Sequence, residues 1–226
     1  DHITNYGTIN QTGAGWFYII GAGSTNGIYN SGTMTALTFE VGFGTITATS
    51  DLDVNAVLVS GGTLDMNNND LTTSNGVNIT GGSLELGTGA WNVTGGNVSI
   101  TSSGAVDASA ATVTLNGSSE QTVATNDNEI LHLVVNNSNG IKLLDNMQID
   151  GRITLNDGSI NTNGNRLTMT STNANDLSGY SSSNFIIANA SGPFRRYIAT
   201  NLSSYIFPMG LGSGSTNYYR MDMRNG

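Results

Sequence analysis

The sequence predicts an all-β fold: a parallel β-helix (β-solenoid) with coils of about 20 residues and a C-terminal β cap or partial β-sandwich. Three observations lead to this prediction. The composition favours short strands joined by tight turns, one strand–turn–strand motif recurs in a fixed phase, and the apolar residues within each copy of the motif alternate with polar ones.

The composition is rich in glycine and poor in charge. Thirty of the 226 residues are glycine, two are proline and 37% are hydrophobic. Charged residues make up 10%, against roughly 25% in ordinary soluble domains. The net charge of −9, with Lys142 as the single lysine, argues against nucleic-acid partners, which require clustered basic side chains. The absence of cysteine excludes disulfides and thiolate zinc sites, and no apolar run suggests insertion into a membrane.

The repeat is the main evidence for the fold. Copies of the motif begin at residues 39, 57, 77 and 153, at intervals of 18, 20 and 76 residues, and they read FEVGFGTITA, VLVSGGTLDM, VNITGGSLEL and ITLNDGSINT. The longest interval is close to four periods of about 19 residues. Alternation within each copy points one face of each strand to a core, and the glycines mark turns.

A single coil of this length is too small to fold alone. It buries about five or six side chains, at roughly 1.5–3 kcal/mol each, against a backbone entropy cost of about 1–2 kcal/mol per residue. Coils stacked about 4.8 Å apart merge their apolar columns into one core. The predicted core ladder contains Val57, Val77 and Val98; Val59, Ile79 and Ile100; Leu64, Leu84 and Val106; and Leu71 and Trp91. A β-sandwich or barrel is the alternative, but the fixed phase favours the solenoid.

The chain divides into three segments. Residues 1–35 keep the Gly and Asn turns but lose the phase, which predicts irregular first coils or an N-terminal cap. Residues 36–177 are predicted to form the solenoid. Residues 178–226 contain both prolines and four of the six arginines, which predicts a C-terminal cap or the start of a β-sandwich module.

Part of the chain resembles a known group of proteins. The runs LHLVVNNSNGIKLLDNMQIDGRITLNDGSINTNGNRLTMTS, GPFRRYI and YIFPMGLGSGSTNYYRMDM, within residues 130–224, resemble secreted surface proteins of the Bacteroidota that the type IX system exports. The resemblance implies a secreted, processed chain, located extracellularly or at the cell surface, with a role in adhesion, gliding or matrix formation. It carries no catalytic residues.

Three carboxylates form the clearest cluster of candidate site residues. Asp65, Glu85 and Asp107 occupy the same outward position in successive coils, so stacking places them about 5 Å apart. A solvated acidic column is the first interpretation. A Ca²⁺ site is the second, because like charges at this distance attract a cation. A glycosidase-like pair that includes Glu85 is the third.

Four aromatic residues are candidates for carbohydrate contact, because exposed rings stack on sugars: Trp16, Tyr18, Tyr218 and Tyr219. The alternative is that they cover the ends of the solenoid. Between residues 30 and 140 the chain has no Lys or Arg, which argues against a polysaccharide lyase that needs basic groups beside acidic ones.

Together these features predict a non-enzymatic extracellular structural or adhesive segment of a bacterial surface protein or filament. It requires no cofactor, and its expected partners are other copies of itself, the cell-surface matrix or glycans. One alternative is a Ca²⁺-dependent carbohydrate-binding module that uses the acidic column. A polysaccharide-degrading β-helix enzyme is the weaker alternative.

Overall fold

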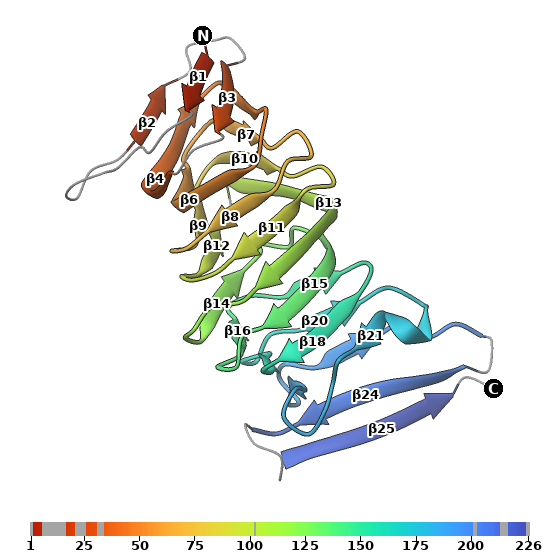
Figure 1. Ribbon diagram of the computed structural model, residues 1–226. Coiled ribbons are helices and arrows are strands. Elements are labelled where there is room, and N and C mark those ends of the chain that lie inside the picture. Colours follow the sequence, from red (N-terminus) through yellow and green to blue (C-terminus); the bar gives the residue numbers. More distant parts are fainter. Residues whose placement is uncertain are drawn as a thin grey trace.

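The chain folds into an all-β parallel β-solenoid of about nine turns, each of about 20 residues, which ends in an antiparallel strand pair. The computed structural model describes residues 2–5, 17–20, 26–30, 34–101, 103–200, 203–212 and 217–224. Figure 1 shows the coils stacked along one axis, with the N-terminus at one end and β24 and β25 at the other. The predicted fold class is confirmed.

Three columns of parallel strands run along the solenoid. The first column contains β1 (His2–Asn5), β3 (Asn26–Asn30), β5 (Thr45–Ala48), β7 (Thr63–Asp65), β10 (Gly82–Glu85), the start of β13 (Gly104–Leu115), the start of β15 (Ile130–Asn136), β17 (Met147–Ile149), β20 (Leu167–Met169) and β23 (Phe194–Arg196). The second contains the start of β4 (Met34–Phe43), the start of β6 (Leu52–Val59), β8 (Leu71–Thr73), β11 (Ala90–Val93), the end of β13, the end of β15, β18 (Ile153–Asp157) and β21 (Leu177–Ser178).

The third column leads to the C-terminal hairpin. It contains β2 (Phe17–Ile20), the end of β4, the end of β6, β9 (Val77–Ile79), β12 (Val98–Ile100), β14 (Gln121–Ala124), β16 (Ile141–Leu143), β19 (Ile160–Asn161), β22 (Ile186–Ile187) and β24 (Ser204–Gly210). The last strand, β25 (Tyr218–Arg224), pairs antiparallel with β24. A short 3₁₀ turn, η1 (Ala174–Asp176), precedes β21.

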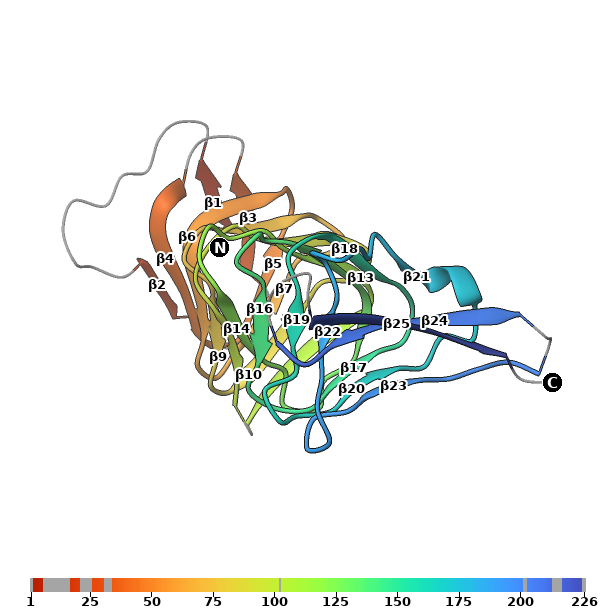
Figure 2. The same ribbon diagram turned by 90° about the horizontal axis from the view of Figure 1, so that it is seen from below.

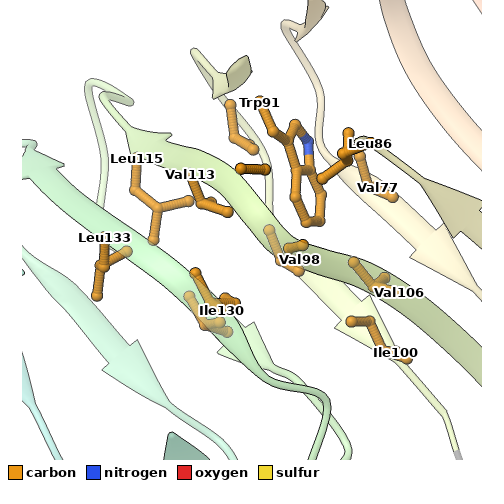
Figure 3. Close-up of a cluster of buried hydrophobic side chains, with 14 of the residues drawn as sticks. Val77, Leu86, Trp91, Val98, Ile100, Val106, Val113, Leu115, Ile130 and Leu133 are labelled. Atoms are coloured by element: carbon orange, nitrogen blue, oxygen red, sulfur yellow. The ribbon is translucent and has the colours of Figure 1, made fainter. Parts of the chain in front are cut away.

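The core is a ladder of inward-facing side chains that, among the described residues, runs from Ile28 to Phe207. Val57, Val77 and Val98 lie in register in the third column, and each is at most 3% exposed. Leu71 and Trp91 lie in register in the second column and are fully buried. Val59, Ile79, Ile100, Leu64, Leu84 and Val106 are also buried and in register with their counterparts. Figure 3 shows part of this cluster around Trp91.

The double glycine of the repeat allows two coils to approach closely. Gly82 has φ = +69°, a left-handed conformation that favours glycine. A Cβ atom at Gly82 would overlap the carbonyl oxygen of Gly62, which belongs to the same motif one coil earlier. The motif therefore keeps glycine for two reasons, the backbone conformation and the contact between coils.

The C-terminal hairpin packs against the last coil. Phe207 of β24 meets Phe194 of β23 edge to face, with ring centroids 5.7 Å apart. Tyr205 is fully buried beside Arg196, whose guanidinium carbon lies 5.0 Å from the centre of the tyrosine ring. Figure 2, seen from below, shows β23 and the β24–β25 pair as neighbouring layers at this end.

The division into three segments stays a prediction. β1, β2 and β3, within residues 1–35, pair in parallel with later strands of the same columns, and the rest of that segment lies outside the described residues. Strand pairing also continues past residue 178, through β22, β23 and β24.

Candidate functional site

The three carboxylates predicted from the repeat share one column. Glu85 of β10 is in register with Asp65 of β7 and with Asp107 of β13. Each carboxylate accepts hydrogen bonds from its own coil. Asp65 accepts from the Asn67 N–H (2.8 Å), Glu85 from the Ser83 hydroxyl (3.3 Å), and Asp107 from the N–H and hydroxyl of Ser109 (3.1 and 2.6 Å).

These bonds engage each carboxylate with donors of its own coil. The Ser109 hydroxyl and N–H lower the pKa of Asp107 below its ordinary value of 3.8. Within the described residues, no group of three or more His, Cys, Asp or Glu side chains is arranged to hold a metal ion. The Ca²⁺ site and the catalytic role of Glu85 therefore stay predictions to which these contacts add no support.

The four candidate aromatic residues are not brought together by the described structure. Trp16 and the side chain of Tyr18 lie outside what is described. Tyr218 is half-buried against Phe185, with ring centroids 5.5 Å apart, and burial raises its pKa. Tyr219 is 59% exposed on β25, where it stands opposite Met209 of β24. Of the residues that can be placed, Tyr219 offers the exposed ring.

Side chains at the turns bind one coil to the next, a contact that the apolar repeat does not predict. The Asp70 N–H donates to the Asp51 carboxylate (2.9 Å), and the Ala90 N–H donates to the Asp70 carboxylate (2.7 Å). Asn97 accepts from the Thr122 N–H in the same way (2.7 Å). The signal in the sequence is the recurrence of Asp at 51 and 70, about one coil apart.

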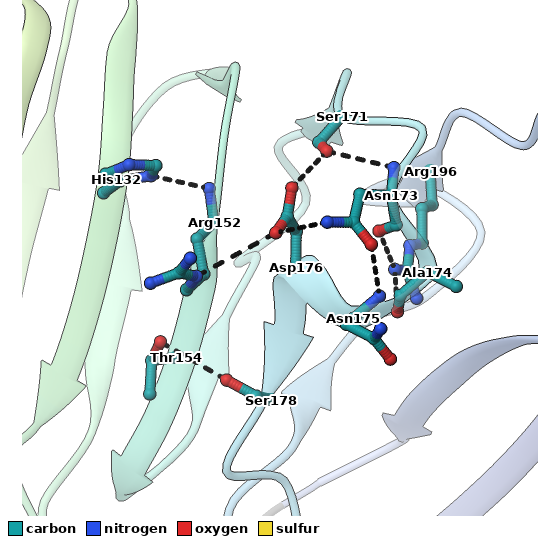
Figure 4. A network of polar contacts seen from close by, with 10 residues as sticks. All are labelled: His132, Arg152, Thr154, Ser171, Asn173, Ala174, Asn175, Asp176, Ser178 and Arg196. Atoms are coloured by element: carbon teal, nitrogen blue, oxygen red, sulfur yellow. Dashed lines mark hydrogen bonds and ion pairs between the residues drawn. The ribbon is translucent and has the colours of Figure 1, made fainter.

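Polar contacts of Arg196 hold the hairpin against the last coils, and Figure 4 shows those that Arg196 makes with Asn173 and Ala174. Arg196 is 7% exposed, and its guanidinium donates to the carbonyl oxygens of Asn173, Ala174 and Ile206 (3.0, 2.6 and 3.0 Å). Burial lowers its pKa. The Arg152 N–H donates to Nδ1 of His132 (2.9 Å), so this histidine acts as a structural acceptor between coils.

A polar groove lies over the outer ends of the third column. Its volume is about 720 Å³, and its lining, apart from Glu120, is uncharged. The polar side chains of the groove include Ser138, Asn139, Ser159, Asn161, Asn163 and Ser183. Asn161 and Ile187 are in register and point outward, because their neighbours Ile160 and Ile186 are buried.

An apolar pocket of about 410 Å³ adjoins the polar groove. It is lined by Ala188, Pro193, Phe194, Met209, Tyr219 and Met221. Asn189 and Leu211 line both hollows, so the groove continues into the pocket. The combined site offers amide and hydroxyl groups at one end and an exposed aromatic ring at the other, which suits binding better than catalysis.

Comparison of the chain with protein-family models, curated proteins and solved structures gives no significant match. Within the described residues, no helix has the length and apolar character needed to cross a membrane.

Proposed function

We propose that the chain is a non-enzymatic structural or adhesive segment of an extracellular bacterial surface protein or filament. The observation that carries this proposal is the continuous ladder of parallel strands through about nine turns, with a single buried core. Every interior coil is hydrogen-bonded on both sides. A force along the axis must therefore break the backbone bonds and remove the apolar side chains of each coil in turn.

The turns add to this resistance. Asp51, Asp70 and Asn97 each accept a backbone N–H from the following coil, so contacts beyond the strands also hold neighbouring coils together. Arg196 anchors the final hairpin through three carbonyl oxygens. The extracellular location is supported by the resemblance of residues 130–224 to exported surface proteins and by the uncharged polar composition.

Single-molecule pulling from the two ends of the chain tests the mechanical role. We expect stepwise extension in which each coil of about 20 residues releases about 65–70 Å of chain. Extension without steps, at forces no greater than those that stretch an unfolded chain, would contradict the proposal. An antibody against residues 36–177 that fails to label intact cells of the producing organism would contradict the surface location.

A further inference from the structure

We propose that the polar groove and the apolar pocket together form one binding site for a neutral, linear glycan. This inference goes beyond the mechanical role, and neither depends on the other. The site is built from the turns of the last coils, at the end of the solenoid that carries the β24–β25 hairpin (Figure 1).

The dimensions of the site suit an extended chain of sugars. The polar groove reaches from Glu120, before β14, to Leu211, after β24. These positions lie four coil spacings apart in the third column, or about 19 Å at about 4.8 Å per coil. An extended glycan advances by a similar length per sugar residue, so equivalent groups on successive coils can meet successive sugars.

The hydrogen-bonding groups of the groove suit hydroxyl groups. Asn161 uses Oδ1 to accept the Asn163 N–H (2.9 Å), and Asn189 uses Oδ1 to accept the N–H groups of Ser191 and Gly192 (3.0 and 2.7 Å). These bonds fix both amides and leave both Nδ2 groups without a partner in the described structure. Asn161 and Asn189 both line the groove, so their Nδ2 groups can donate to the hydroxyl groups of a ligand there.

The charge of the site selects neutral sugars. Glu120 is the charged residue among those that line the groove and the pocket. Lys142 is the outward neighbour of Asn161 on β16. With one carboxylate and one nearby ammonium group, the site lacks the repeated basic side chains that a polyanionic glycan would need.

The apolar pocket supplies a stacking surface. Tyr219 is 59% exposed, and Met221, two residues further along β25, is 45% exposed. The apolar face of a sugar ring stacks on an aromatic ring of this kind. An extended peptide fits less well, because β16, β19 and β22 under the groove are paired on both sides and offer no free edge for strand addition.

Native gel electrophoresis in soluble polysaccharides tests the site. The neutral probes are hydroxyethyl cellulose, galactomannan and arabinoxylan, and the polyanionic probe is alginate. We expect at least one neutral polysaccharide to retard the wild-type protein, alginate to have no effect, and cellotetraose to compete for binding. Mobility in a gel without polysaccharide is the reference for each variant.

Two pairs of variants connect binding to the site. The double variant Asn161→Asp with Asn189→Asp keeps both Oδ acceptors and removes both donors, and we expect it to bind about tenfold more weakly. Its control, Asn78→Asp with Asn92→Asp, makes the same change in charge on distant outward positions and should bind within twofold of wild type. Tyr219→Ala should also lose about tenfold, whereas Tyr219→Phe keeps the ring and the affinity.

Three results would overturn the glycan site: no retardation by any neutral probe, undiminished binding by Tyr219→Ala, or competition by a Ser- and Asn-rich peptide but not by cellotetraose. Thermal melting verifies that each variant is folded. If the double Asp variant does not fold, the Tyr219 pair decides alone. Failure of the glycan site leaves the pulling experiment unaffected, so the two proposals fail separately.

Discussion

At Gly82 the backbone of one coil passes directly over the backbone of the preceding coil. Its positive φ and the overlap that a Cβ would create with Gly62 are two separate constraints. Gly164 has φ = +84° but has no atom within 4 Å of where a Cβ would stand. A comparison of Gly82 with Gly164 therefore separates the cost of backbone strain from the cost of steric contact between coils.

We expect Gly164→Ala to lower the free energy of unfolding by about 1–2 kcal/mol, the cost of a left-handed conformation for a residue with a Cβ. Gly82→Ala should cost a further 1–3 kcal/mol or so, because the coils must also move apart. Urea denaturation of both variants measures the difference. Equal losses would show that the close approach of the coils has no energetic importance.

At the scale of the strand, alternation decides which substitutions matter. Leu84 of β10 is fully buried, whereas Leu58 of β6 lies between the inward-facing Val57 and Val59 and is partly exposed. Leu84→Ala should lower the free energy of unfolding by about 2–5 kcal/mol, because it leaves a cavity in the ladder.

Leu58→Ala makes the same chemical change on the outward face, so we expect it to cost less than about 1 kcal/mol. Thermal or urea unfolding of the two variants gives the comparison. A larger loss from Leu58→Ala than from Leu84→Ala would contradict the assignment of the two faces.

The fold could be predicted from the sequence because the same apolar pattern recurs at the same position of successive coils. Apolar residues such as Val57 and Val77 recur at a spacing near the length of one turn, and a parallel ladder requires that spacing. The phase also places Glu85 between Asp65 and Asp107. The spacing of the repeat does not reveal that each carboxylate accepts its hydrogen bonds from its own coil, because those contacts depend on side-chain torsions.

The groove could not be predicted for a related reason. Ser159 and Asn161 belong to the motif copy that begins at residue 153, but Ser138 and Ser183 come from turns outside the quoted copies of the motif. Which turns project and which recede depends on the packing of the last coils. Residue type alone points to the four aromatic candidates, and of these Tyr219 lines the pocket that adjoins the groove.

At the scale of the whole molecule, charge is unevenly distributed along the axis. Residues 1–141 contain eleven Asp and Glu residues and no Lys or Arg, whereas all seven basic residues follow Ile141. The acidic coils repel one another, most directly along the column of Asp65, Glu85 and Asp107. Screening should therefore stabilise the molecule.

We expect the melting temperature to rise by about 2–4 °C when NaCl is raised from about 10 mM to about 150 mM, which shortens the Debye length from about 30 Å to about 8 Å. Differential scanning calorimetry measures the shift. A melting temperature that falls or stays constant would contradict it. CaCl₂ that stabilises more than NaCl of equal ionic strength, with reversal by EDTA, would instead favour the Ca²⁺ column.

Paired strands of the solenoid lie close together in the sequence, which affects how the molecule forms. Glu85 pairs with Asp65, and Val77 with Val57, so a strand finds its partner about one coil earlier in the chain. A polypeptide that emerges gradually from a narrow pore can therefore add each coil to those already formed, without waiting for its distant end. Growth by successive coils would hold the emerged part in place and oppose backward sliding of the chain.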